Sequence, residues 1–314
     1  MIAAVAQSGW AQSSAQVYLD RMSHSFRELD YRGVFTYEFG EQMESLRIIH
    51  VVRDGVERER LLHLDGDPVE YVRDAHQLSC VHPGHQKLRL GMGAGVPLAR
   101  KMISTERVTD YYELATGGLT RVADRPAREV AVLPRDPYRY GFRLYLDEQT
   151  GLLLKSLTLG PRGEIIERFQ FVDIEIGAAV DDAELAMSAS GGTSVHHHML
   201  EQDSQRPSVA LSAPAEPQWV PPGFTPSAST GLRPDKAAEP ALMYTDGFAT
   251  FTLVVEEIDP LLALPTDGRA RKGATVAYVR HVTAAERSYV LTVVGEIPLM
   301  TARKVARSVS LSSR

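Results

Sequence analysis

Cysteine is nearly absent from this 314-residue sequence, in which Cys80 stands alone. No disulfide can therefore form within the chain, and the count leaves the redox compartment open. The strand-like residues around Cys80 favour a partly buried thiol with a packing role. Long apolar runs are also missing, since none approaches the ~18 residues of a membrane span. Neither disulfides nor a membrane helix is thus expected to organise the fold.

Basic patches are lacking too. The formal charge is -6 and the pI is about 5.9, and no block of Lys and Arg offsets this balance locally. These values argue against nucleic acid as a partner. With 44% hydrophobic and 24% charged residues, the chain has the composition of a soluble globular protein long enough for two domains.

Catalytic and metal-binding signatures are missing as well. Neither H-E-x-x-H nor G-x-S-x-G occurs, and the glycine run at residues 91–95 fits no phosphate-binding spacing. The triplet His196-His197-His198 has no Cys, Asp or Glu at ligand spacing, so a solvated histidine run is favoured over a metal site. We therefore expect no enzyme, no cofactor and no metal, and whether the histidine run has any function stays open.

What the sequence does have is a stretch of strands at residues 139–176. Three strand-like runs are separated by turn signals at residues 147–151 and 160–163. The first run places alternate residues on one apolar face: Tyr140, Phe142, Leu144 and Leu146. The third run, residues 165–176, has apolar residues at both parities, which predicts that both of its faces are covered.

The remaining pattern predicts two domains. A helix capped by Ser13 or Ser14 should end near Asp30, and a second should run from Ser104 or Thr105 to Leu114, stopped by the Gly117-Gly118 pair. Further strands are expected at residues 34–39, 46–53, 56–64, 69–73, 78–82, 119–123 and 128–133, so that about ten antiparallel strands precede residue 178.

The C-terminal part predicts a smaller sheet with one helix. Residues 242–244 and 248–256 flank a Thr-Asp-Gly hairpin signal, strands follow at 275–282 and 289–294, and a helix begins at Pro298. The expected domain limits are 13–186 and 218–314, joined by a linker at 187–217 that is rich in Ser, Ala, Gly and Pro. Residues 1–12 are either the remnant of a signal peptide or a flexible terminus.

Several predicted strands carry apolar residues at both odd and even positions, that is, on both faces. This pattern has two explanations. The first is ordinary core packing, which the residues alone favour, and the second is a cavity for an apolar ligand. An acyl chain gains ~0.8 kcal/mol for each buried CH₂, so even a partly inserted chain is able to shift a conformational equilibrium.

Seven segments stand out together and in order along the chain: YRGVFTYE at 31–38, RERLLHLDG at 58–66, residues 139–157, ERFQF at 167–171, WVPPGF at 219–224, residues 242–256 and VVGEIP at 293–298. Taken together, they resemble the RseB/MucB family of periplasmic regulators of the envelope-stress sigma factor. The resemblance implies an α+β fold, in which the N-terminal domain is similar to LolA and LolB. That domain would be an incomplete antiparallel β-barrel with helices in its mouth, followed by a smaller C-terminal antiparallel-sheet domain with one helix.

The resemblance also implies a function and a location. A member of this family binds the periplasmic region of a MucA-like or RseA-like anti-sigma factor, protects it from site-1 proteolysis, and is released by lipid or lipopolysaccharide acyl chains. A periplasmic carrier of lipids or lipoproteins is the alternative, and a homodimer stays open.

Candidate site residues follow from these two readings. The residues expected to line a lipid cavity are Phe35, Tyr37, Leu61, Tyr71, Tyr140, Phe142 and Leu144. Those expected to contact the protein partner are Tyr244, Phe248 and Phe251.

Overall fold

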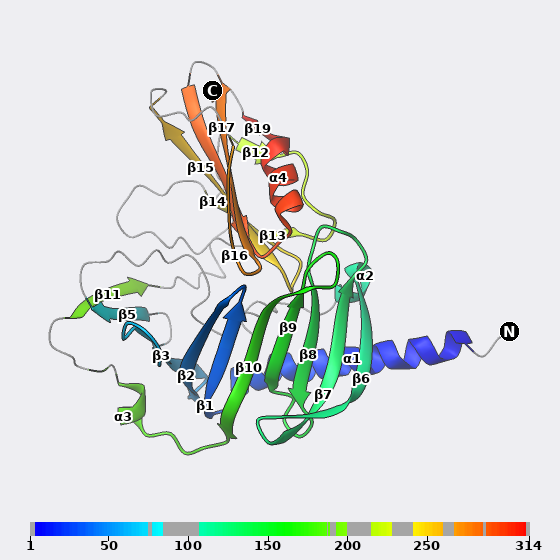
Figure 1. Ribbon diagram of the computed structural model, residues 1–314, viewed down its shortest axis with the longest axis vertical. Helices are drawn as coiled ribbons and strands as arrows, with labels where there is room; N and C mark the ends of the chain where they lie inside the picture. The colour runs from blue at the N-terminus through cyan, green and yellow to red at the C-terminus, as the bar shows by residue number, and fades with distance from the viewer. Residues whose placement is uncertain are drawn as a thin grey trace.

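The computed structural model describes residues 4–74, 77–83, 107–186, 188, 193–199, 215–227, 241–259, 267–284 and 287–311. Two antiparallel sheets dominate this part of the chain (Figure 1). The larger has the order β11-β5-β4-β3-β2-β1-β10-β9-β8-β7-β6, and the smaller has the order β13-β14-β15-β18-β17-β16. The predicted α+β class, with a large N-terminal sheet and a smaller C-terminal one, is confirmed.

In the residues that the structure describes, the N-terminal domain contains one long helix, two short ones and the large sheet. The helices are α1 (Ala4–Glu28), α2 (Val108–Tyr111) and α3 (Asp182–Leu185). The strands are β1 (Tyr31–Phe39), β2 (Gln42–Arg53), β3 (Val56–His63), β4 (Glu70–Asp74), β5 (Gln77–Pro83), β6 (Tyr112–Val122), β7 (Arg125–Pro134), β8 (Gly141–Asp147), β9 (Leu153–Leu159), β10 (Ile165–Ile176) and β11 (Thr193–Met199).

The C-terminal domain pairs its sheet with helix α4 (Leu299–Ser308). Its sheet strands are β13 (Thr225–Ser227), β14 (Ala241–Thr245), β15 (Thr250–Ile258), β16 (Gly268–Lys272), β17 (Thr275–Ala284) and β18 (Arg287–Gly295), and β12 (Ala215–Pro217) pairs separately with β19 (Val309–Leu311). Pro298, expected as the first helical residue, is instead the N-cap, and α4 begins one position later at Leu299. Ala302, Val305 and Ala306 pack this helix against the sheet.

Helix α1 fills the inner side of the large sheet. Its buried residues Ala15, Leu19, Met22 and Phe26 share one core with the inward side chains of the strands. Cα atoms of β6 and β10 lie within 8 Å of each other although β9, β8 and β7 separate them, so the sheet curls around the helix. The sheet does not close, since its order begins with β11 and ends with β6. This is an incomplete barrel, as predicted.

The second predicted helix is wrong over most of its length. Only α2 is helical, and the chain is already in strand β6 from Tyr112 onward. The Gly117-Gly118 pair does not stop a helix but lies at an irregularity in the β6–β7 pairing. The 3.6-residue spacing of Val108, Tyr111 and Tyr112 was misleading because Tyr112 and Leu114 are also at strand spacing, and both are buried in the sheet.

Residues 165–176, the third predicted run, form strand β10. The prediction that both faces of this strand are covered is also wrong. A register shift separates the pair Val34↔Asp173 from the pair Phe35↔Phe171, so one residue of β10 is extra. After this bulge the inward parity changes, and Ile174 joins Phe169 and Phe171 in the core while Val172 is 60% exposed. The sequence appeared apolar at both parities because a single inward face changes parity within the strand.

The predicted linker contains regular structure. Strand β11, which includes the histidine triplet, pairs antiparallel with β5, and β12 pairs with β19. Composition suggested a linker because Ser, Gly and His rarely fill strands, but an edge strand needs only its backbone groups to pair. The side chains of the triplet and of Cys80, and the glycine run at 91–95, lie outside what the structure describes.

Candidate functional site

The seven residues predicted for a lipid cavity all belong to the N-terminal core. Five of them are at most 3% exposed, namely Phe35, Leu61, Tyr140, Phe142 and Leu144, and Tyr37 and Tyr71 pack against the same core while half-buried. Phe35 contacts Phe169 and Phe171 at ring-centroid distances of 4.9 and 5.8 Å. The structure therefore brings this set together, and lipid binding by it stays a prediction.

The three residues predicted to contact a partner are not brought together. Tyr244 and Phe251 stack on each other in the C-terminal core, with ring centroids 5.1 Å apart. Phe248 lies instead in the N-terminal core and is 1% exposed. All three are buried in this conformation, so a role in partner binding stays a prediction and would require these side chains to move.

Phe248 reaches the other domain on a turn that we call the inserted turn, residues 245–249, between β14 and β15. Its ring packs between Phe142 and Tyr112, at centroid distances of 5.7 and 5.3 Å. The two domains thus share a buried aromatic cluster. This residue links the predicted cavity set to the C-terminal domain.

The conformation of the inserted turn is dictated by its own sequence. Asp246 Oδ1 accepts hydrogen bonds from the backbone amides of Phe248 and Ala249, at 3.0 and 2.8 Å. Thr245 Oγ1 accepts from the Gly247 amide and donates to the Ala249 carbonyl. Gly247 has a φ of +97°, which glycine adopts without steric cost. The Thr-Asp-Gly signal therefore folds locally and presents Phe248 at its tip.

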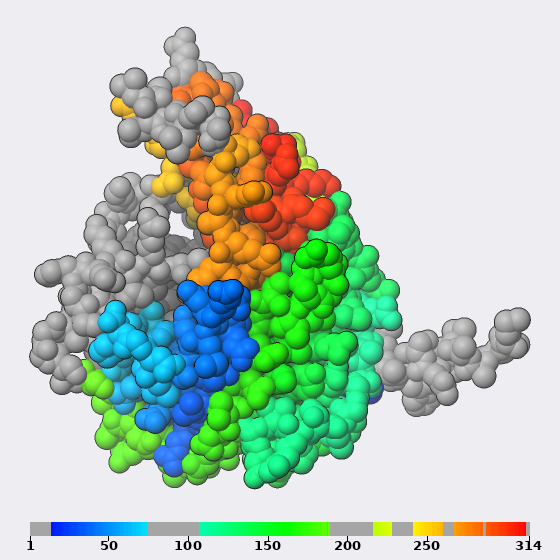
Figure 2. Space-filling model, viewed as in Figure 1, coloured from blue at the N-terminus to red at the C-terminus, as the bar shows by residue number. Residues whose placement is uncertain are grey.

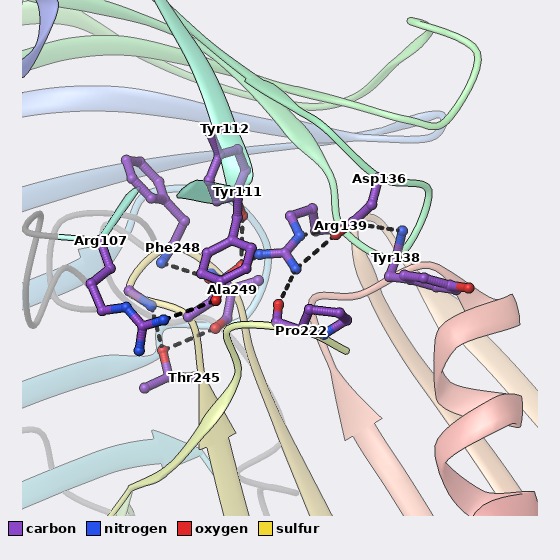
Figure 3. A network of polar contacts seen from close by, with 12 residues as sticks. Arg107, Tyr111, Tyr112, Asp136, Tyr138, Arg139, Pro222, Thr245, Phe248 and Ala249 are labelled. Atoms are coloured by element: carbon purple, nitrogen blue, oxygen red, sulfur yellow. Dashed lines mark hydrogen bonds and ion pairs between the residues drawn. The ribbon is translucent and has the colours of Figure 1, made fainter. Parts of the chain in front are cut away.

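Arg139 of the N-terminal domain holds the other oxygen of Asp246, within the network of polar contacts that Figure 3 shows around Arg139. Arg139 Nη1 donates to Asp246 Oδ2 at 2.6 Å, and both side chains are 0% exposed. Tyr112 also donates its hydroxyl to Asp246 Oδ2, at 2.9 Å. The same guanidinium makes two hydrogen bonds to Asp136 and one to the carbonyl of Pro222. The buried ion pair is thus supported by hydrogen bonds on both of its charges.

Aromatic rings enclose this network. The Arg139 Cζ lies 4.9, 5.4 and 5.3 Å from the ring centroids of Tyr111, Tyr112 and Phe224. A Cβ on Gly223, whose φ is +89°, would lie 2.3 Å from the Tyr111 ring, so only glycine lets the ring approach this closely. The rings exclude water and strengthen the charge interactions among the groups that they enclose.

The electrostatics favour a structural role. Burial and the charge of Asp246 raise the pKa of Tyr112 well above its usual value. Burial acts to lower the pKa of Arg139, but its contacts with Tyr112, Asp136 and Asp246 outweigh that effect and raise it. The phenol thus stays protonated and the guanidinium stays charged. Such groups hold two domains together and do not exchange protons near neutral pH.

Two further groups of contacts join the domains. Lys304 of α4 lies 3.9 Å above the Trp219 ring and 4.7 Å above the Tyr138 ring, and Thr301 Oγ1 donates to the Tyr138 carbonyl. At the other end, the Ala274 amide donates to Glu167 Oε1 at 2.7 Å.

The second of these contacts also involves charges near the barrel rim. Lys272 forms a 3.7 Å ion pair with Glu44 and lies over the ring of Phe39. Burial and the neighbouring Glu167 raise the pKa of Tyr37. Figure 2 shows the orange residues of the C-terminal domain resting on the blue strands at this point.

Arg139 is the residue that sequence reasoning missed. Strict alternation placed it on the polar side of the first run, opposite Tyr140, yet its side chain is fully buried. It lies in the turn before β8, where alternation does not apply. The only sequence signal for its burial was the presence of two carboxylates, Asp136 nearby and Asp246 in the Thr-Asp-Gly turn. Nothing in the sequence shows that both of them contact Arg139.

The described residues show neither a metal-binding cluster nor a membrane-spanning helix. No group of three or more His, Cys, Asp or Glu side chains in this part of the chain is placed to hold a metal ion. None of the described helices has the length and apolarity required to cross a bilayer.

Comparison with known proteins gives matches along both domains. The model of the MucB/RseB N-terminal domain matches residues 14–189, and that of the MucB/RseB C-terminal domain matches residues 213–310. The "Sigma factor AlgU regulatory protein MucB" of Pseudomonas aeruginosa is 35% identical over 95% of this chain and 91% of its own length. The "Sigma-E factor regulatory protein RseB" of Escherichia coli K12 is 25% identical over 96% of this chain and 92% of its own length.

Solved structures with the same architecture include two complexes. A crystal structure of MucB in complex with MucA(peri) is 34% identical, with a TM-score of 0.73 over 96% of this chain and all of the other. The complex structure of Pseudomonas aeruginosa MucA/MucB has the same identity and coverage and a TM-score of 0.75. The likeness spans both domains in each case.

Proposed function

The chain belongs to the MucB/RseB family, and from that premise we propose that it is a negative regulator of the envelope-stress sigma factor. It acts by binding the periplasmic region of a MucA-like or RseA-like anti-sigma factor. The observation that carries this proposal is the likeness to the MucB chain of the MucA(peri) complex over 96% of the present chain. The full two-domain body that binds MucA in that complex has a counterpart here.

The proposal includes a place and a protective role. The chain works in the periplasm, where the anti-sigma segment is exposed to the site-1 protease. Bound to that segment, it denies the protease an extended substrate. This role needs a binding surface and no catalytic group, and the relatives are named as regulatory proteins.

Release by lipid completes the proposal. Lipid or lipopolysaccharide acyl chains insert among the seven apolar residues of the N-terminal core and lower the affinity for the anti-sigma segment. The support is that these residues lie in one core, together with Phe248 of the other domain. A ligand that enters this core therefore changes contacts of both domains at once.

The alternative, a carrier of lipids or lipoproteins, has less support. A carrier needs only the N-terminal barrel, whereas here the C-terminal domain is tied to the barrel through Asp246, Phe248 and Lys304. We therefore expect the purified chain to leave acylated lipoproteins in membranes and not extract them.

The decisive measurement is titration calorimetry of the purified chain with the periplasmic segment of the anti-sigma factor. We expect saturable binding at micromolar protein, and a lower affinity when lipid A is added. A segment of scrambled sequence is the control, and light scattering of the free chain tests the homodimer. Absence of binding to the native segment at micromolar protein would overturn the proposal.

A further inference from the structure

The inserted turn (residues 245–249) combines two chemistries within three residues. Asp246 supplies a carboxylate that is held by Arg139 Nη1 and the Tyr112 hydroxyl, at 2.6 and 2.9 Å. Phe248 supplies an apolar ring that packs against Phe142 and Tyr112 inside the N-terminal core. An anionic lipid offers a similar pair of groups: its head group corresponds to the Asp246 carboxylate, and its acyl chain corresponds to the Phe248 ring.

The receptor for these two chemistries belongs entirely to the N-terminal domain. We call it the socket and define it as Arg139, Tyr112, Tyr111 and Phe142. Arg139 keeps Asp136 as a partner without the turn, since Asp136 binds Nε and Nη2 while Asp246 binds Nη1. Removal of the turn therefore leaves one guanidinium donor, one phenol donor and an apolar wall.

We propose that the socket is a binding site for an anionic single-chain amphiphile, and that the inserted turn is its intramolecular occupant. Head group and Asp246 compete for Arg139 and Tyr112, and the acyl chain and Phe248 compete for the wall at Phe142. The inference rests on the proposed function for its biological meaning and names the place at which a lipid acts.

Competition at the socket is coupled to the arrangement of the domains. The turn is part of the β14–β15 hairpin, and Asp246 Oδ1 binds two backbone amides of the turn, so the carboxylate cannot leave Arg139 by a side-chain rotation alone. An amphiphile in the socket therefore displaces the hairpin, and with it the C-terminal sheet. The contacts of Lys304 with Tyr138 and of Ala274 with Glu167 then lose their geometry.

Calorimetric binding of dodecyl phosphate, dodecanoate and dodecanol to the full chain tests the proposal. The two anions distinguish a phosphate from a carboxylate head group, and the alcohol reports the acyl chain alone. We expect both anions to bind more tightly than dodecanol. The variants Phe248→Ala and Asp246→Asn should bind the better anion about tenfold more tightly than the parent chain, because the socket is no longer occupied most of the time.

The matched control is Phe251→Ala. Phe251 is as buried as Phe248, at 1% exposure, but it lies in the C-terminal core, where its ring packs on Tyr244 and Phe224. This variant should bind the amphiphiles like the parent chain. Asp246→Asn keeps the Oδ1 acceptor that shapes the turn, so this variant is expected to fold. If Phe248→Ala does not fold, the affinity of Asp246→Asn for the anion tests the proposal.

A distance measurement reports the domain movement. Spin labels are placed at Val172 and Met300, which are 60% and 52% exposed, in a Cys80→Ser background. Addition of dodecyl phosphate should broaden the distance distribution between them. Unchanged affinity in both inserted-turn variants, equal binding of dodecanol, or an unchanged distance distribution would each refute the proposal.

Failure of this inference is separable from failure of the proposed function. Binding of the anti-sigma segment to the unaltered chain without any amphiphile tests the function alone. A chain that binds that segment but gives one of the refuting results above keeps the regulatory function and loses the socket.

Discussion

Arg139 shows how a single buried charge joins two domains. Removal of a guanidinium from water costs several kcal/mol, and that cost is offset here by Asp136, Asp246 and the carbonyl of Pro222. Its partners come from both domains, so the guanidinium makes its full set of hydrogen bonds only while the domains are docked as observed. The main effect of such a residue is to specify one arrangement of the two domains, and its contribution to the free energy of unfolding is smaller.

His50 gives the fold a dependence on pH. It is 2% exposed, and its Nδ1–H donates to the Leu29 carbonyl at 2.9 Å. Burial lowers its pKa, and the nearby Glu59 only partly opposes this. Above the unfolded-state pKa both states are neutral. As the pH falls below that value, the unfolded chain takes up a proton that the folded chain resists, so stability is lost.

We predict that His50→Gln reduces this loss of stability in acid. One group contributes at most ~1.4 kcal/mol per pH unit, and the variant should lose less stability than the parent chain between about pH 7.5 and pH 5.5. Urea unfolding at the two pH values measures the difference. His24→Gln, at an exposed position, is the control. Equal acid sensitivity of parent and His50→Gln would show that this histidine does not carry the effect.

At the scale of elements, the bulge in β10 decides which residues face the core. Gly33 of β1 lies beside the bulge, where it pairs with Ile174, and a Cβ there would meet the Asp173 carbonyl oxygen at 2.4 Å. The extra residue and the close approach belong together, because the bulged strand bends toward its neighbour. The bulge turns Ile174 inward and so completes the wall near α1.

Gly33→Ala should therefore destabilise the N-terminal domain by about 2 kcal/mol, since backbone must move to admit the methyl group. Gly118→Ala is a matched control, because that glycine also lies in a strand and a Cβ added to it would have no atom within 4 Å. The urea midpoint of each variant is the measurement. A Gly33→Ala protein as stable as Gly118→Ala would contradict the close packing at the bulge.

At the scale of the whole molecule, the two domains behave as one body. Their contacts in the described residues include the aromatic cluster around Phe248, the Arg139 network, the Lys304 stack and the Glu167 hydrogen bond. Because Phe248 belongs to the core of the N-terminal domain, that core is complete only when the C-terminal domain is docked. Unfolding of one domain thus exposes apolar surface of the other.

Calorimetry should show one cooperative transition for the parent chain and two for Phe248→Ala. The substitution removes the shared side chain, at a cost of about 4 kcal/mol for a buried Phe→Ala change. Phe251→Ala should lower the transition temperature without splitting it in the same way. A single transition at reduced temperature in Phe248→Ala would mean that Phe248 is an ordinary core residue and does not couple the domains.

Much of the architecture was predictable from local pattern. The β14–β15 hairpin follows from Thr245, Asp246 and Gly247, and the inward set Tyr140, Phe142, Leu144 and Leu146 follows from alternation. Both depend on residues near each other in the chain. The interpretation of residues 104–114 as a helix failed because a short apolar pattern fits a helix and a strand equally well.

The sequence by itself determined the two domains, the hairpin turns and the apolar faces of most strands, because turn chemistry and side-chain period act over a few residues. Only the tertiary structure decided that Arg139 is buried, that Phe248 belongs to the other domain, and that Ile174 faces inward. Each of these depends on a partner far away in the sequence or on the register with a neighbouring strand. Long-range contacts and register are properties of the packed chain, and no local pattern encodes them.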